Sequence, residues 1–230
     1  MFNSIGKAAA AACFTVLLAA GAFAQTSGTV TINGTVSKYV EITSGGGVTL
    51  TGNSTGGVTT DGTANSPLAV VLDFGELGPS NENTFVKATV PLKIRSNAAY
   101  ELGVLASVTS TGTSSDKIAA ADIGFGLGTA SRTGTGVASG TDTNATGGDP
   151  TLAANGQLNA TSGRFEFKGT LGNLGAFGSN TVVLSGPRVM NAVPRANTNG
   201  LTVPAYFAVK PQFYEVGTVS ATVTFTVTAP

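Results

Sequence analysis

The side chains that most often carry enzyme chemistry are scarce in this chain. The sequence has no His, and its single Cys, Cys13, lies in an apolar run near the N-terminus. A Ser-His-Asp or Cys-His nucleophile cannot be assembled from these residues, and neither can a typical zinc or copper site. Two carboxylates, Asp73 and Glu76, are close enough in sequence to serve as a glycosidase pair, but their spacing is ordinary for a strand end. We therefore predict that the protein is not an enzyme and has no catalytic or cofactor-binding residues.

The oxygen ligands that calcium prefers occur together in one Gly-rich stretch, as Asp142, Asn144 and Asp149. Their spacing does not match the EF-hand loop, which also needs a closing Glu. Solvated polar side chains of a loop are the better interpretation, so we predict no metal site.

Four aromatic residues near the C-terminus form the densest aromatic group of the chain: Tyr206, Phe207, Phe213 and Tyr214. They are a possible ligand surface, because aromatic rings can line a groove or stack on sugars. In a β-sandwich, residues of this kind more often belong to the core or cover an edge strand.

The N-terminus has the pattern of a secretory signal peptide. Lys7 precedes an uncharged apolar run over residues 8–20, and the small-x-small sequence Ala22-Phe23-Ala24 follows it. The run is shorter than the roughly 20 residues that span a bilayer, and no basic stop-transfer cluster follows it. We predict that cleavage after Ala24 removes residues 1–24 and that the mature chain, which begins at Gln25, is exported.

The composition indicates a β protein without a strongly charged partner. Only 10% of the residues are charged, Gly occurs 32 times, and loss of Lys7 leaves one more acidic than basic side chain. Such a chain attracts neither nucleic acid nor an anionic membrane, and we expect no stable membrane insertion. Thr and Val suit strands, and Gly suits turns. Because the mature chain has no Cys, its stability must come from burial and backbone pairing.

Alternation of apolar and polar residues is clearest at the two ends of the mature chain, where it predicts strands with one buried face. It runs from Val30 to Ile42, and again over residues 218–228. Residues 128–163 have few large apolar side chains and are expected to form a long surface loop. Together the strands predict a single immunoglobulin-like antiparallel β-sandwich. Further short apolar segments bounded by turn residues predict strands over 68–74, 85–94, 100–108, 123–127, 164–170, 181–184 and 201–209, with a weak hairpin around 48–50.

Five segments carry a resemblance to a known family: residues 29–43, 71–75, 92–102, 203–209 and 217–227. The first runs straight into a strand, the second is an apolar strand ending in Phe74-Gly75, and the third is a strand, turn and strand around Tyr100. In this order they resemble the spore coat protein U domain, the pilin module of archaic chaperone-usher pili. The chain differs from many members because it lacks their disulfide, with no Cys near Val40 or Ser96, and because its loop over 128–163 is enlarged.

The resemblance implies a sandwich that lacks its last strand and is completed by an N-terminal segment of a neighbouring subunit. Residues 25–43 would hold this donor segment and the first strand, and residues 44–230 the sandwich domain. The donor would insert Val30, Ile32 and Val36, with Gly34 where a pocket is shallow. The edge strand of the acceptor groove would present Val219, Ala221, Val223, Phe225 and Val227.

The function implied by the resemblance is that of a structural subunit of a pilus-like surface fibre, with a role in adhesion or biofilm. Its partners would be copies of itself or related pilins, a periplasmic chaperone and an outer-membrane usher. The subunit would pass through the periplasm and end at the cell surface or in an extracellular fibre. The alternative is a secreted monomeric adhesin or carbohydrate-binding β-sandwich.

Overall fold

The computed structural model describes residues 32–79, 85–152 and 156–230. The chain divides into two compact units, residues 1–37 and 38–230. In the first unit only residues 32–37 are described, and they form neither strand nor helix. The predicted signal peptide, its cleavage site and Val30 of the predicted donor all lie outside the described residues.

The regular secondary structure of the second unit is nearly all β-strand, and its described residues also include two short 3₁₀ helices, η2 (Ala120–Asp122) and η3 (Leu174–Phe177). No helix in the described part of the chain is long and apolar enough to cross a membrane. The strands are β1 (Val40–Ser44), β2 (Thr49–Thr51), β3 (Gly57–Thr60), β4 (Val71–Asp73), β5 (Lys87–Ser96), β6 (Tyr100–Ser110), β7 (Ile123–Leu127), β8 (Ser131–Thr133), β9 (Thr143–Asn144), β10 (Gly156–Leu158), β11 (Phe165–Phe167), β12 (Thr181–Gly186), β13 (Gly200–Val209) and β14 (Val219–Thr228).

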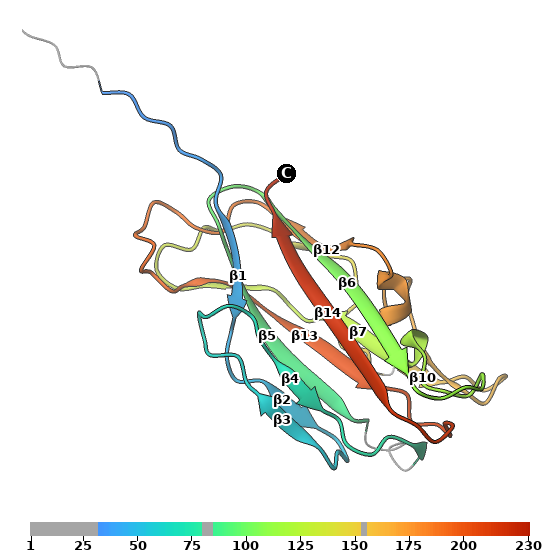
Figure 1. The fold of residues 1–230 in the computed structure, drawn as a ribbon. Coiled ribbons are helices and arrows are strands. Elements are labelled where there is room, and N and C mark those ends of the chain that lie inside the picture. Colours follow the sequence, from blue (N-terminus) through green and yellow to red (C-terminus); the bar gives the residue numbers. More distant parts are fainter. Residues whose placement is uncertain (1–31, 80–84, 153–155) are drawn as a thin grey trace, which may run out of the picture. The chain divides into compact units, whose positions relative to one another are not determined.

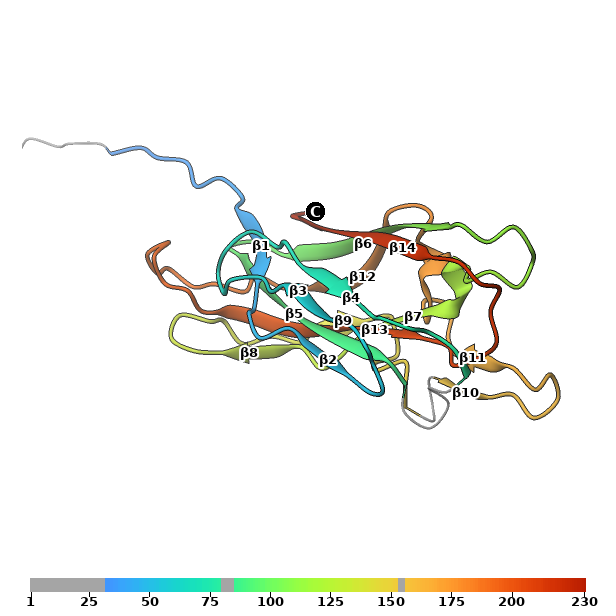
Figure 2. The ribbon, with the colours of Figure 1, turned by 60° about the horizontal axis from the view of Figure 1, so that its bottom comes forward.

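The strands form two main antiparallel sheets that pack together, as Figures 1 and 2 show from two directions. The first sheet has the order β1-β5-β13-β7, with β2 pairing β5 and β8 pairing β13. The second has the order β14-β6-β12-β9. Two small two-stranded sheets, β3-β4 and β10-β11, are separate from both. The expected all-β antiparallel sandwich is confirmed.

The core lies between the two sheets and is filled by alternate residues of the long strands. In β5, the four residues Ala88, Val90, Leu92 and Ile94 are each 4% exposed or less, while the residues between them are half-buried. This is the pattern of a strand with one face on the core. The aromatic centre of the core is Phe125 of β7, whose ring centroid lies 5.0 Å from that of Phe177 and 5.5 Å from that of Phe207.

Most predicted strands are present. Residues 123–127 form β7 with the predicted bounds, and 218–228 and 201–209 match β14 and β13 to within a residue. The N-terminal alternating pattern forms a strand only from Val40 onward within the described residues, because β5, its partner, ends its pairing where Ser96 faces Val40. Residues 48–50 contribute to β2, which pairs with β5 instead of forming a hairpin of its own.

The expected loop over residues 128–163 is more ordered than its composition indicates. Its strand β8 pairs with β13, and its strand β9 pairs with β12, so this segment is attached to both main sheets. Inside it, the Thr146 hydroxyl accepts a hydrogen bond of 2.7 Å from the backbone N–H of Leu127, and Asn144 donates to the Leu127 carbonyl at 2.8 Å. The segment is an extension of the sandwich rather than a free surface loop.

Burial in the core can be tested on two leucines of one strand. Leu102 of β6 is fully buried, whereas Leu105, three residues on, is 41% exposed. We expect Leu102→Ala to lower the free energy of unfolding by about 2–5 kcal/mol, because it leaves a cavity, and Leu105→Ala to cost under about 1 kcal/mol. Urea unfolding followed by circular dichroism measures both. Equal losses would contradict the placement of the core.

Candidate functional site: the open edge of β14

The last strand, β14, is an edge strand of the second sheet. It pairs with β6 along its whole length, from Val219 opposite Ser110 to Thr228 opposite Glu101. No strand in the described ranges pairs with its other edge. That edge presents backbone N–H and C=O groups in a row, which is the arrangement that a further strand can extend. In Figure 1, β14 lies along the front of the sandwich, with β1 beside part of it but not paired with it.

The core-facing side chains of β14 are poorly covered. Val219, Val223, Phe225 and Val227 are only half-buried, and Ala221 is exposed, in contrast to the fully buried alternate residues of β5. Phe225 does reach the core, since its ring centroid lies 6.2 Å from that of Phe125. The inner face of β14 therefore belongs to the core but lacks part of its cover. These five residues are the ones predicted to edge the acceptor groove.

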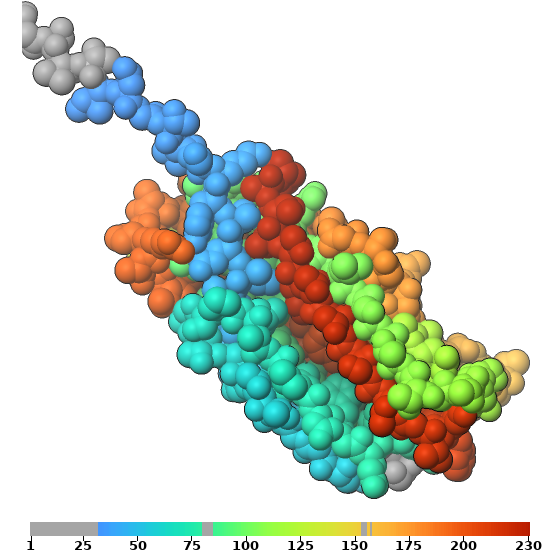
Figure 3. Space-filling view, viewed as in Figure 1, coloured from blue at the N-terminus to red at the C-terminus, as the bar shows by residue number. Residues whose placement is uncertain are grey.

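A second row of half-buried apolar residues comes from residues 68–74. Leu68, Val70, Leu72 and Phe74 alternate with exposed residues and pack against the core. Within this segment β4 pairs only with β3, so it joins neither main sheet. Figure 3 shows a furrow that runs beside β14, between β14 and the segment that carries β3 and β4. The furrow thus has apolar residues on both sides and an unpaired strand edge along one of them.

The two ends of β14 are fixed by polar contacts. At its start, the Thr218 N–H donates to the Thr111 hydroxyl at 2.8 Å, and the nearby Glu215 carboxylate accepts from the Ser114 N–H at 2.8 Å. These hydrogen bonds to Glu215, with that from Thr113, lower its pKa. Beyond its last residue, the Lys38 ammonium donates to the Pro230 carbonyl oxygen. These hydrogen bonds hold both ends of β14 in place, and with them its open edge.

Three of the predicted donor residues, Ile32, Gly34 and Val36, lie within the described part of the chain. Ile32 and Val36 are 90% and 89% exposed, and Gly34 has no atom within 4 Å of the position of a Cβ. If the segment becomes a strand, the alternating pattern places the side chains of Ile32 and Val36 on one face, with Gly34 between them.

The four aromatic residues of the possible ligand surface do not come together on one surface. Phe207 is 9% exposed and belongs to the core, so its neighbour Tyr206 projects from the opposite face of β13. Phe213 is 84% exposed in the turn before β14. The Tyr214 hydroxyl donates to the Lys210 carbonyl at 2.9 Å, and burial, with the nearby Asp122 charge, raises the Tyr214 pKa. Adjacent strand residues face opposite sides, so closeness in sequence did not produce a common surface.

The carboxylates considered for catalysis have structural contacts at the end of β4. Asp73 accepts a hydrogen bond from the Gly75 N–H at 2.8 Å, where Gly75 has a φ of +70°. The backbone N–H of Glu76 donates to the Thr55 hydroxyl at 2.8 Å. These contacts form a turn in which a Gly is required, because other residues rarely adopt this φ.

The three residues considered as calcium ligands also take part in internal contacts. Asp142 pairs with Arg132, Asn144 bonds the Leu127 carbonyl, and Asp149 pairs with Lys87 at 2.5 Å. Within the described ranges no group of three or more His, Cys, Asp or Glu side chains could hold a metal ion.

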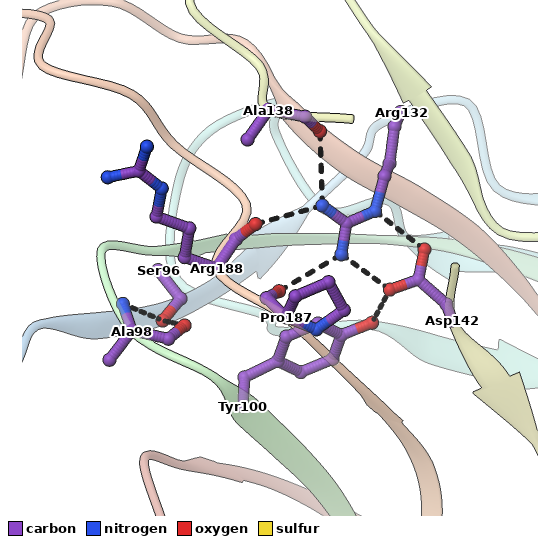
Figure 4. A network of polar contacts seen from close by, with 8 residues as sticks. All are labelled: Ser96, Ala98, Tyr100, Arg132, Ala138, Asp142, Pro187 and Arg188. Carbon is purple, nitrogen blue, oxygen red and sulfur yellow. Dashed lines mark hydrogen bonds and ion pairs between the residues drawn. The ribbon is translucent and has the colours of Figure 1, made fainter. Parts of the chain in front are cut away.

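Among the described residues, a well-connected polar group centres on Arg132, and the sequence alone did not indicate it. Figure 4 shows the Arg132 guanidinium donating to both carboxylate oxygens of Asp142, at 2.7 and 2.6 Å. The same guanidinium donates to the carbonyls of Ala138, Pro187 and Arg188 at 2.9–3.1 Å. Asp142 also accepts a hydrogen bond of 2.7 Å from the Tyr100 hydroxyl.

This network connects three separate parts of the chain, namely β6, the 128–163 segment and the loop after β12. The hydrogen bond with Asp142 raises the pKa of Arg132, although burial acts against it. Burial, with the hydrogen bond to Asp142, raises the pKa of Tyr100. The Tyr100 hydroxyl therefore stays neutral and donates to Asp142. Such paired and fully hydrogen-bonded charges serve to fix geometry. The network is structural, and it attaches the 128–163 segment to the second sheet.

The chain matches no protein-family model, no curated protein and no solved structure. The resemblance to the spore coat protein U domain therefore stays a prediction.

The Lys87–Asp149 pair predicts a pH dependence of stability. Burial opposes ionisation of Asp149, but hydrogen bonds from Lys87 and Thr151 outweigh it and lower the pKa of Asp149. The pair therefore stabilises the fold above the ordinary Asp pKa of about 3.9, and this contribution is lost as the pH falls through the lowered value. We expect Asp149→Asn to cost about 1–3 kcal/mol near neutral pH and progressively less in acid. Urea unfolding of both proteins between about pH 2.5 and 7 measures this difference, and a difference that grows in acid would contradict the assignment.

Proposed function

We propose that the protein is a structural subunit of a cell-surface fibre whose copies join by β-strand complementation. The observation that carries the proposal is the open edge of β14, with an apolar inner face that is only half-covered. The same chain has an exposed alternating apolar segment before β1. A strand of this kind, inserted beside β14, would pair with its free backbone and cover its inner face.

The donor segment is short enough to pair along β14. At about 3.3 Å per residue, residues 30–36 extend over about 23 Å, which fits within the length of the ten-residue β14. Their apolar side chains, Val30, Ile32 and Val36, would each contribute about 1.5–3 kcal/mol on burial. Gly34 would face a part of the furrow with little depth.

The inserted segment would come from a neighbouring copy rather than from the same chain. Val40 of β1 faces Ser96, and Thr228 of β14 faces Glu101, so both lie at the same end of the sandwich. To enter its own furrow, the segment would have to reverse direction within residues 37–39. Tight reversals favour Gly, Asn or Asp, which are absent there. The backbone of Tyr39 is also bonded in both directions to Asn97.

Insertion into a neighbour gives a heterologous contact, which repeats head to tail and generates a filament. Before assembly, the open furrow would need protection by another protein, which is the role of a periplasmic chaperone, with an usher at the outer membrane. These partners, the export through a signal peptide and the location in a surface fibre all follow from the resemblance described above. Together they make one consistent hypothesis for a chain without recognisable catalytic residues.

Filling the furrow from the acceptor side should block assembly. Ala221 is on the inner face of β14 and is exposed, so Ala221→Phe places a large ring where the donor would lie. Thr222, the next residue, is exposed on the opposite face, and Thr222→Phe is the matched control. We expect the first variant to lose most of its fibres and the second to keep them, as counted by electron microscopy of the protein exported from its own host. Normal fibres from Ala221→Phe, with the folded state confirmed by circular dichroism, would disprove the proposed acceptor.

The donor side gives a second test. Ile32→Asp puts a charge on the face that would insert, and Asn33→Asp puts the same charge on the other face of the alternating segment. Because a buried unpaired carboxylate costs several kcal/mol, we expect Ile32→Asp to reduce polymer formation at least tenfold and Asn33→Asp to change it little. Polymer ladders on gels run without boiling measure both variants. Equal ladders would contradict the predicted donor.

A further inference from the structure

A cavity of about 470 Å³ lies at the junction of the 128–163 segment with β13. Its lining includes Tyr206, Leu152, Asp142, Asn144 and Asp149. The volume falls within the range of about 300–1,000 Å³ that small-molecule sites occupy. The cavity is distinct from the furrow beside β14, since the two share no lining residue.

The aromatic wall of this cavity is Tyr206. In the β13–β7 pair Tyr206 faces Gly126, which has no side chain to cover the ring. Gly128 also packs closely against this ring, because a Cβ there would lie 2.9 Å from the Tyr206 hydroxyl oxygen. The Lys87 ammonium lies 5.5 Å from the ring centroid and also pairs with Asp149. A Cβ at Gly126 would lie 1.7 Å from the Gly148 carbonyl oxygen, so both glycines let neighbouring backbone and the Tyr206 ring pack closely, and the half-buried ring lines the cavity.

The polar wall is held in place by the sandwich. Asp142 is fixed by Arg132 and Tyr100, and Asp149 by Lys87 and Thr151. Gly147 and Gly148 have φ values of +81° and +97°, which lets the backbone between these two carboxylates turn sharply. Ligand groups that bind here would meet oxygen acceptors whose positions are already set, which lowers the entropy cost of binding.

We propose that this cavity is a binding site for a neutral saccharide. An aromatic ring and the 58% exposed Leu152 side chain would contact the C–H faces of a sugar ring. Asp142 Oδ2, which accepts from the Arg132 Nε–H, would use its remaining lone pair to accept from a sugar hydroxyl, and Asn144, whose Oδ1 already accepts from Thr146, would donate the second N–H of its amide. Both carboxylates are already neutralised by Arg132 and Lys87, so the cavity has no excess charge to attract a cation or an anion. This site would add adhesion to the role proposed for the fibre.

The test uses the complete exported protein and a panel of neutral trisaccharides of glucose, galactose, mannose and N-acetylglucosamine. Binding is read by saturation-transfer NMR and titration calorimetry. We expect at least one trisaccharide to bind the wild type. We expect Tyr206→Ala to weaken binding at least about tenfold, because the stacking surface is lost, and Tyr206→Phe to stay within about threefold. Phe213→Ala is the matched control, since Phe213 is an exposed aromatic residue outside this cavity.

Three outcomes would overturn the proposal: no binding by any trisaccharide of the panel, binding by Tyr206→Ala equal to that of the wild type, or binding that disappears with EDTA. Urea unfolding of each variant shows whether the fold is retained. The fibre proposal is tested separately, because Ala221→Phe alters the furrow and leaves the cavity intact. Sugar binding that persists in Ala221→Phe, together with fibres that persist in Tyr206→Ala, would show that the two sites are independent.

Discussion

An apolar strand face is stable only when other residues cover it, and in this sandwich β14 meets that condition only in part. Its partner β6 supplies hydrogen bonds along one edge, and Phe225 reaches the ring of Phe125 in the core. The other inward-facing valines of β14 pack against the core only in part, and Ala221 is exposed. A strand inserted beside β14 would satisfy two needs at once, because it would pair the free backbone and complete the core.

No disulfide connects the strands of this sandwich, because Cys13 is the only Cys of the chain. Polar networks in the described part of the chain connect segments that are distant in sequence, as the one around Arg132 does. A guanidinium suits this role because its donors form a planar fork that can serve a carboxylate and several carbonyls together. Removing Asp142 or Arg132 alone would leave a poorly solvated charge behind, so the two residues depend on each other.

The sequence predicted the long strands well because a regular alternation over many residues is hard to produce by chance. In β13 and β14 this alternation is bounded by turn residues, and the observed bounds agree with it. The short strands β8 and β9 could not be predicted, since two or three residues hold no periodic pattern and their pairing depends on distant partners. The same reason hid the Arg132 network, which brings together side chains from three segments. The opposite orientation of Tyr206 and Phe207 could have been expected from their adjacency in a strand.

The pairing of β6 with β14 also has a consequence for how the chain folds. Residues of β6 contact residues more than 100 positions later in the chain, so the structure has a high contact order. A chain that crosses a membrane from its N-terminus delivers β14 last. Until then β6 lacks one neighbour, and the second sheet cannot close over the core. If the protein is exported as proposed, it would therefore pass through a stage with exposed strand edges, in which aggregation competes with folding.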